Sequence, residues 1–321
     1  MSVTRLRRKS GLVIALAVGA LMSATALAYS TPVRVKATAK NEVGPAADDD
    51  WFAWSKSRER QASPFDLYAQ QAGKRAFRVN KKGTQAYAGG IDGTTLVYQV
   101  IRGALAVGSD LRLFDLATRR HKPIPRGIST NSWECCGTLS GDWLLFSRGR
   151  AYGPARQLVI LRNLRTGEQR VLDTLRNRKG LVSAGQLNGT FAVWMRCNPY
   201  PRCQVFRYDL TTASATALPV APGKVPYAPS VNEFGTAYYL QSNEGCGRSV
   251  ELMKQRLTGA PELLAELPSG RDVDVAYAHT VTARPPQEVL TTAIYFDVIT
   301  CKGRRWDVYR VDDTERVPPP S

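Results

Sequence analysis

Four side chains that carry oxygen donor atoms have the type and spacing that could hold a metal ion. Asn131 and Glu134 lie three positions apart, and Asp272 and Asp274 lie two positions apart. Residues two apart on a strand share a face, so the two aspartates would point the same way. Carboxylate and amide oxygens suit a hard cation such as calcium. Acidic pairs at this spacing are common, so these are weak candidates unless the fold brings them together.

Two pairs of cysteines are predicted to form disulfides, because an even number of cysteines in an exported chain implies such bonds. The sequence contains six cysteines. Cys197 and Cys203 bracket a short loop containing two prolines, and the ends of that loop can meet. Cys246 and Cys301 are predicted to form the second bond.

The remaining cysteines, Cys135 and Cys136, are adjacent in the chain. A bond between adjacent cysteines is strained and uncommon. Two buried thiols, or bonds to other cysteines, agree with the sequence equally well. No zinc site is predicted, because no second closely spaced pair supplies further ligands and His121 and His279 stand alone.

Nucleophilic catalysis finds no support in the sequence. There is no Gly-x-Ser-x-Gly elbow of the kind that positions a serine nucleophile. His121 lies in the charged segment Arg119–Lys122, which is typical of a solvated surface, and His279 is expected to be a structural residue. We therefore assign no catalytic and no cofactor-binding residue.

The first 28 residues are typical of an export signal. A basic patch from Arg5 to Lys9 precedes an apolar run from Gly11 to Leu27, and small residues occupy both recognition positions before the expected cleavage after Ala28. The mature chain is therefore expected to be secreted or otherwise extracytoplasmic. A signal retained as a membrane anchor is the alternative.

The chain is strongly basic, with 44 basic against 27 acidic residues and a net charge of +17. Four basic residues fall within the predicted signal, which leaves 40 basic residues in the mature chain. Such a balance attracts polyanions, which outside a cell include wall polymers and acidic polysaccharide. The arginine-rich segment 162–179 has no aromatic residue for base stacking, so specific nucleic-acid recognition is not expected.

The elements that carry these residues follow a repeat. Four copies have a glycine before an apolar and aromatic strand, with spacings of 48, 48 and 46 residues: Gly93, Gly141, Gly189 and Gly235. Two flanking copies lack the glycine, at Trp51–Trp54 and Ala293–Phe296. Each copy continues into a second strand with a polar turn, then into a third and a fourth strand. A four-stranded, WD40-like unit of this length, without helical periodicity, predicts an all-β fold, a six-bladed β-propeller.

The repeat also sets the expected domain limits. Residues 1–28 are the signal peptide, 29–47 an N-terminal strand or linker, 48–317 the propeller and 318–321 a C-terminal tail. Thr31–Lys40 is expected to add a strand to the last or first blade and to close the ring.

Over residues 48–313 the repeat resembles the TolB-like family of six-bladed propellers. Blades of that family typically open with Pro-x-Trp-Ser-Pro-Asp-Gly, whereas the corresponding segments here are Thr138–Asp142 and Gln186–Gly189. This departure places the chain at the divergent edge of the family. The resemblance implies a scaffold that binds partners or ligands, and it carries no catalytic role to any residue.

Two functional hypotheses follow. The first is a secreted, monomeric, non-catalytic scaffold that binds a protein or an anionic envelope component through the rim of second-to-third-strand loops. The second is a lactone- or ester-type hydrolase or lyase with a metal, such as calcium, in the central channel. Acidic and amide groups on the axis would favour the enzyme, and small or apolar groups would favour the scaffold.

Overall fold

The fold is given by a computed structural model that describes residues 31–36, 40–58, 64–103, 108–149, 156–177, 179–243, 249–267, 278–283, 289–299 and 306–316. The predicted signal peptide and the predicted Cys246–Cys301 bond lie outside these residues, as do Asp272 and Asp274. Every element of regular structure within the described ranges is a β-strand. These ranges contain no helix that is long and apolar enough to cross a membrane.

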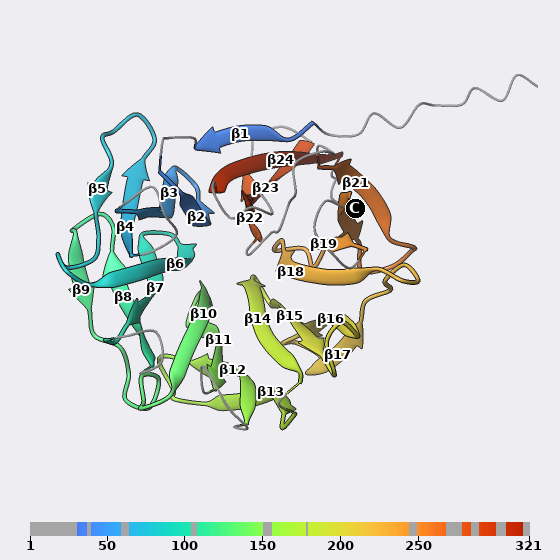
Figure 1. Cartoon of the computed structure of the whole chain (residues 1–321), viewed down its shortest axis with the longest axis horizontal. Helices are drawn as coiled ribbons and strands as arrows, with labels where there is room; N and C mark the ends of the chain where they lie inside the picture. The colour runs from blue at the N-terminus through green and yellow to red at the C-terminus, as the bar shows by residue number, and fades with distance from the viewer. Residues whose placement is uncertain are drawn as a thin grey trace, which may run out of the picture.

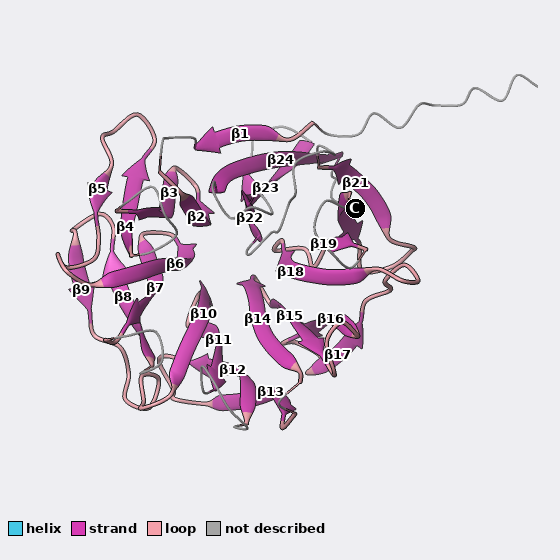
Figure 2. Ribbon diagram, viewed as in Figure 1, coloured by secondary structure: helices cyan, strands magenta, loops and turns pink. Residues whose placement is uncertain are grey.

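The strands form antiparallel units of four that surround a common centre, which is the arrangement of a β-propeller (Figures 1 and 2). Unit 1 contains β2 (Glu42–Asp48), β3 (Trp51–Ser57), β4 (Phe65–Gln71) and β5 (Phe77–Arg78). Unit 2 contains β6 (Gln85–Asp92), β7 (Thr95–Ile101), β8 (Ser109–Asp115) and β9 (Arg120–Lys122). Unit 3 contains β10 (Trp133–Ser140), β11 (Trp143–Gly149), β12 (Gln157–Asn163) and β13 (Gln169–Leu175).

The other three units follow the same order along the chain (Figure 1). Unit 4 contains β14 (Leu181–Asn188), β15 (Phe191–Cys197), β16 (Cys203–Asp209) and β17 (Ser214–Ala217). Unit 5 contains β18 (Val225–Val231), β19 (Ala237–Ser242), β20 (Val250–Gln255) and β21 (Glu262–Glu266). Unit 6 contains β22 (Ala278–Ala283), β23 (Val289–Ile299), β24 (Trp306–Arg316) and β1 (Val33–Lys36).

Hydrogen bonding groups these strands into four sheets of four strands and one sheet of eight. The prediction of six separate four-stranded sheets therefore differs from the structure at one place. Units 2 and 3 are joined by a single parallel pair, Ser109 with Trp133. The cause is local, because Ser109 also bonds to unit 3 through its side chain, whose Oγ donates to the carbonyl of Glu134 at 2.6 Å.

The N-terminal strand β1 lies beside β24 and completes unit 6 (Figure 1). Arg34 Nη2 lies 2.7 Å from Asp307 Oδ2 across this pair. The strands of unit 1 begin with β2 at Glu42, Asp48 is the last residue of β2, and Asp49 and Asp50 form the turn between β2 and β3. The three acids therefore lie within unit 1, at the end of β2 and in the turn that follows it.

Strands with successive apolar residues lie between two neighbouring units and are buried on both faces. Leu144, Leu145 and Phe146 of β11 are all fully buried. Leu144 and Phe146 pack with Val97 and Leu111 of unit 2, while Leu145 packs against unit 4. A strand with one solvated face would alternate apolar and polar residues, so continuous apolar runs are the expected pattern here.

The predicted turn glycines connect the first and second strands of units 2 to 5. Gly93, Gly141, Gly189 and Gly235 have φ angles of 56°, 54°, 56° and 80°. Glycine occupies such angles without the steric penalty that a Cβ atom brings. The turns also contact their neighbours, because Asp48 Oδ2 accepts a hydrogen bond from Gly93 N at 2.5 Å and Asp92 Oδ2 accepts one from Gly141 N at 3.0 Å.

Units 5 and 6 share a buried ion pair. Lys254 Nζ on β20 lies 2.6 Å from Asp313 Oδ2 on β24, and both side chains are buried. The Tyr238 hydroxyl donates a second hydrogen bond to the same oxygen at 2.8 Å. Lys254 also contacts Glu315.

We expect Lys254→Met to lower the free energy of unfolding by about 3 kcal/mol, because removal of one partner leaves the other charge buried without compensation. The matched control is Arg165→Met at the exposed Arg165–Asp142 pair, which should cost less than about 1 kcal/mol. Urea unfolding of the three proteins measures both values. Equal small losses in the two variants would contradict a structural role for the buried pair.

Burial raises the pKa of Asp48 to about 6. Its folded state therefore binds a proton more tightly than the unfolded chain, and the stability that this proton gives is present at low pH and lost as the pH rises through about 6. We expect the stability of Asp48→Asn relative to wild type to fall as the pH is lowered from 7 to 4.

Asp115→Asn is the control of opposite sign, because the hydrogen bond from Thr118 N lowers the pKa of Asp115. That variant should be less stable than wild type at pH 7, with the difference closing below about pH 4. Urea unfolding at several pH values tests both signs.

Candidate functional site

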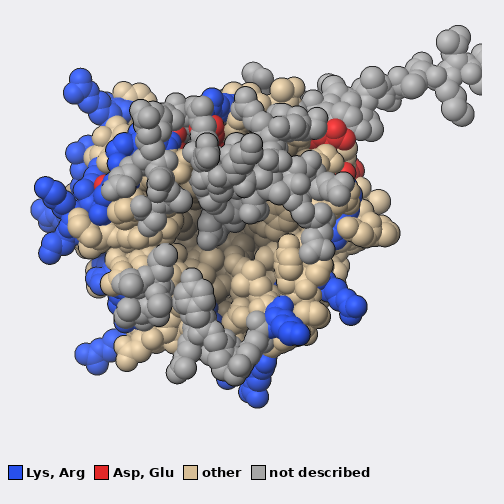
Figure 3. Space-filling model, viewed as in Figure 1, with Lys and Arg blue, Asp and Glu red and all other residues tan. Residues whose placement is uncertain are grey.

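A cavity of about 340 Å³ lies between the first strands of the units. In the space-filling view the surface is hollowed near the centre of the disc, and Lys and Arg side chains lie around the outer edge of the disc (Figure 3). The lining residues come mainly from β2, β6, β10, β14 and β18. They are Gly44, Pro45, Tyr87, Ala88, Gly89, Gln99, Cys135, Cys136, Thr138, Leu181, Ser183, Ala184, Gly185, Met195, Tyr227, Ala228 and Pro229.

A β-bulge at the same level of each of these five first strands shapes the cavity. Every strand shifts register against its neighbour after the second to fourth residue, and two residues fall out of the pairing each time. The bulge residues are Gly44-Pro45, Gly89-Gly90, Cys136-Gly137, Gly185-Gln186 and Ala228-Pro229. Bulges bend a strand and re-aim its side chains. The repeated bulge therefore turns a ring of small residues toward the axis.

The small size of these residues lets neighbouring first strands approach closely. A Cβ atom on Gly89 would lie 2.2 Å from the carbonyl oxygen of Gly137 in the next unit. A Cβ atom on Gly185 would lie 2.3 Å from the carbonyl oxygen of Pro229. Both contacts are with backbone, which cannot move aside as the end of a side chain could.

Amide groups at or beside the bulges are hydrogen-bonded by side chains of the preceding unit. The bonds are Ala88 N to Ser55 Oγ at 3.0 Å, Ala184 N to Ser147 Oγ at 2.6 Å and Gly44 N to Asp297 Oδ2 at 3.2 Å. Buried amides need such partners where the strand ladder is interrupted. These bonds fix the positions of the cavity walls relative to one another.

The polar side chains of the lining are bonded within the wall. Tyr87 Oη accepts a hydrogen bond from Gln85 at 2.7 Å, and burial raises the pKa of Tyr87. Gln99 Nε2 donates to Ser109 Oγ at 2.9 Å. Among the described lining residues there is no aspartate, glutamate or histidine. The described wall is therefore neutral and consists largely of small and apolar residues.

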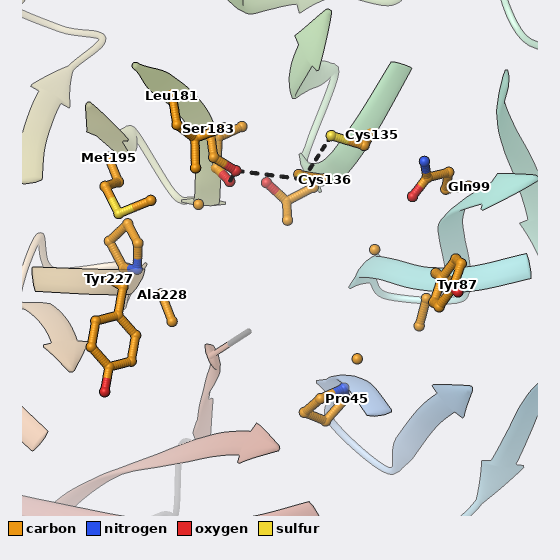
Figure 4. A pocket seen from close by; sticks show the side chains of 17 residues that line it. Pro45, Tyr87, Gln99, Cys135, Cys136, Leu181, Ser183, Met195, Tyr227 and Ala228 are labelled. Atoms are coloured by element: carbon orange, nitrogen blue, oxygen red, sulfur yellow. Dashed lines mark hydrogen bonds between the residues drawn. The ribbon is translucent and has the colours of Figure 1, made fainter. Parts of the chain in front are cut away.

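Cys135 and Cys136 both belong to the lining, and their sulfur atoms are in contact (Figure 4). Cys136 Sγ donates to Cys135 Sγ at 2.9 Å, and the Ser183 hydroxyl on β14 donates to Cys136 Sγ at 3.6 Å. The hydrogen bond with Cys136, together with burial, raises the pKa of Cys135 well above its usual value.

The predicted metal candidates do not meet in the described part of the structure. Glu134 is fully buried, but its Oε1 lies 3.0 Å from Arg148 Nε and accepts a hydrogen bond from Thr130 Oγ1 at 2.5 Å. Asn131 is exposed. Neither residue lines the cavity.

The predicted Cys197–Cys203 disulfide is confirmed, with an S–S distance of 1.95 Å. The bond closes the loop between β15 and β16, and Tyr200 at the tip of that loop is 58% exposed. The Tyr200 amide donates to the carbonyl of Lys179 at 3.0 Å, which ties the loop to the segment before β14. Leu181, the first residue of β14, lines the cavity and is 45% exposed.

Basic residues surround this loop. Arg176, Lys179 and Arg202 are exposed beside Tyr200. Nothing in the sequence indicated that Lys179 and Tyr200 lie together, because their hydrogen bond depends on the path of the chain between units 3 and 4. We call Leu181, Tyr200, Arg176, Lys179 and Arg202 the unit 4 rim patch.

Two arginines of the arginine-rich segment 162–179 are paired with acidic residues of the protein. Arg165 pairs with Asp142, and Arg170 pairs with Glu168. His121 is exposed on β9 and contacts the Tyr98 hydroxyl at 3.2 Å, and His279 lies in β22 opposite Tyr295.

No protein-family model matches this chain, and no curated protein matches it. The TolB-like resemblance is therefore not confirmed. Similarity is found among solved structures. An oligogalacturonate lyase in complex with manganese has a TM-score of 0.52 at 9% identity, covering 91% of this chain and 95% of the lyase.

Two further structures are similar at lower scores. The oligogalacturonate lyase from Vibrio parahaemolyticus has a TM-score of 0.48 at 9% identity, covering 87% of this chain and 81% of that one. The β-propeller domain of the Trilobed protease from Pyrococcus furiosus has a TM-score of 0.48 at 10% identity, covering 87% of this chain and 98% of that domain. At such identities the similarity concerns the fold alone.

We expect Gly89→Ala to destabilise the protein by about 1–3 kcal/mol, because the new methyl group meets the Gly137 carbonyl and overpacks the contact between units 2 and 3. Gly149→Ala is the control, since its Cβ would be 3.4 Å from the nearest atom, a side-chain carbon of Gln157. That substitution should change the free energy of unfolding by no more than about 0.5 kcal/mol. Urea unfolding of both variants makes the comparison, and equal effects would contradict the close approach at the bulge.

Proposed function

We propose that this chain is an exported, non-catalytic β-propeller of six blades that binds an acidic protein partner through the unit 4 rim patch and the mouth of the central cavity. The proposal rests on one observation. The exposed Tyr200 lies on a disulfide-closed loop, the exposed Leu181 lies at the cavity edge, and three exposed basic residues belong to the same patch.

The count of six blades rests on the pairing of units 2 and 3. One residue pair joins them, whereas neighbouring strands within each unit are mostly paired along their length. We therefore treat the eight-stranded sheet as two adjacent blades. Export and a divergent TolB-like relationship remain part of the proposal on the grounds given by the sequence.

The rim patch has the composition of a protein-binding surface. Tyrosine and arginine are enriched at the energetic centres of interfaces, where a large side chain fills a partner's pocket or lies between charged groups. The loop of Tyr200 is held before binding by the Cys197–Cys203 bond and by the hydrogen bond from Asn198 N to the Arg202 carbonyl at 2.9 Å. A loop that is already ordered loses less conformational freedom on binding.

Charge selects the kind of partner. The described residues of 176–182 and 196–203 include no acidic side chain, and the chain as a whole has a net charge of +17. An acidic partner surface complements this patch and is drawn to it over distance. The neutral cavity beside Leu181 has a volume of about 340 Å³, which suits an apolar side chain of that partner.

The alternative hydrolase or lyase finds less support among the described residues. Calcium and manganese prefer carboxylate and carbonyl oxygens, and the described lining contains no carboxylate. Glu134 is held by Arg148. The oligogalacturonate lyases are similar in fold at 9% identity, which carries no substrate to this chain.

Site-specific photo-crosslinking in the producing cells tests the proposal. A photoreactive amino acid at position 200 should give one dominant protein adduct, which mass spectrometry identifies. The same amino acid at position 257 is the matched control, because Leu257 is 53% exposed and follows the third strand of its unit, at the opposite end of the strands from Tyr200. Equal adducts at both positions would overturn the proposed face.

With the purified partner, we expect Tyr200→Ala and Arg202→Glu each to weaken binding at least tenfold, and Leu257→Ala to leave it unchanged. Calorimetry at two salt concentrations measures the affinities. If heparin binds the wild-type protein and the Tyr200→Ala variant equally well, the partner is a polyanion, and this result would contradict a protein partner. The alternative hydrolase or lyase has its own test. If the protein turns over oligogalacturonate in the presence of manganese or calcium, and Asp272→Asn abolishes this turnover, the proposed binding function is wrong and the enzyme takes its place.

A further inference from the structure

The fold brings the sulfur atoms of Cys135 and Cys136 together in a way that a regular strand could not. Successive side chains of a strand point to opposite faces, so two adjacent cysteines would face apart. In β10 the register shift between Cys135 and Thr138 interrupts this alternation. Cys136 adopts a φ of 58°, and its sulfur lies 2.9 Å from that of Cys135.

This position carries a conformational cost for any residue with a Cβ atom. Gly44 holds the equivalent bulge position of unit 1 at the same φ of 58° without that cost, whereas Ala228 of unit 5 adopts a φ of 48° and shares the cost. A left-handed conformation costs a residue with a Cβ on the order of 1–2 kcal/mol, and glycine escapes that cost. At Cys136, unlike at Ala228, this conformation places a reactive side chain on the cavity wall in contact with a second thiol.

Small molecules can reach the pair. Both cysteines are partly exposed and line the central cavity, with the Ser183 hydroxyl of the neighbouring strand β14 beside Cys136 (Figure 4). The chain also contains the Cys197–Cys203 disulfide, which indicates that it folds where disulfides persist.

We propose that Cys135 and Cys136 form a reversible vicinal disulfide on the wall of the central cavity, made and broken by exchange with low-molecular-weight disulfides and thiols of the glutathione class. Closure needs the sulfur atoms to approach from 2.9 Å to about 2.05 Å. The closed form removes two S–H groups from the lining and with them the hydrogen bond from Cys136 to Cys135. The pair thus sets the polarity of the cavity wall according to the redox state around it.

The exchange proceeds in two displacements. One thiolate of the pair attacks a sulfur of the external disulfide, which forms a mixed disulfide and releases one thiolate that takes up a proton. The second protein thiolate then attacks the protein sulfur of the mixed disulfide, forms the Cys135–Cys136 bond and releases the second external thiol. The pair loses two electrons and two protons, and the external disulfide gains both. The reverse sequence opens the bond.

Peptide mapping tests the proposal, because trypsin leaves both cysteines in one peptide, Gly127–Arg148. After incubation of the folded protein with oxidised glutathione and alkylation of remaining thiols, this peptide should carry no alkyl group and should lack two hydrogen atoms. After treatment with reduced glutathione it should carry two alkyl groups. Below the raised pKa of Cys135, closure should become about tenfold faster per pH unit.

Cys136→Gly is the control variant that keeps the fold, because Gly44 occupies the same bulge position in unit 1 at the same φ of 58°. In the reduced state it should be at least as stable as wild type, and Cys135 should then be alkylated singly or recovered as a mixed disulfide. Reduced wild-type protein should bind one phenylarsine oxide across the pair, and Cys136→Gly should lose that binding. Two alkyl groups on the wild-type peptide after oxidation, or a bond from either residue to Cys246 or Cys301, would overturn the proposal.

Discussion

The bulge in the first strand of each of units 1 to 5 is the constraint on which the rest of this structure depends. A bulge takes residues out of the strand ladder, yet their amide groups lie inside the disc and must be hydrogen-bonded. The preceding unit supplies acceptors at this level, as Asp297 does for the bulge residue Gly44 and as Ser55 and Ser147 do for Ala88 and Ala184 beside the bulges. One set of residues therefore lines the cavity and holds neighbouring units together, so that a change in the wall is also a change in the contact between units.

Closure of the ring is the second requirement, because a row of units that did not close would expose strand edges at both ends. The chain meets it with β1, which pairs with β24, and with the buried Lys254–Asp313 pair between units 5 and 6. The closed ring holds the neutral cavity and the Tyr200 loop in a fixed relation. In the proposed function the rigid ring provides the geometry, and the loops at one end of the strands provide the specificity.

Several features were predictable because they depend on short stretches of chain. The turn glycines and the apolar strands that follow them recur at regular spacing, and Cys197 and Cys203 are close enough in sequence for their loop to close in only a few ways. The bulges were not predictable, because Gly44 and Cys136 occupy the same structural position without sharing a residue type. Glu134 was a reasonable metal ligand by type, but the register of β10 with β11 places it opposite Arg148.

The sequence by itself determined the strand order, the turns between strands and the local disulfide, since these follow from side-chain size, backbone freedom and loop length. Tertiary structure alone decided that the described cavity wall is neutral, that Tyr200 lies beside Lys179 and that the sulfur atoms of Cys135 and Cys136 face the same space. The physical reason is that side-chain direction in a strand depends on register. A bulge changes that register through contacts with a neighbouring strand that no local pattern encodes.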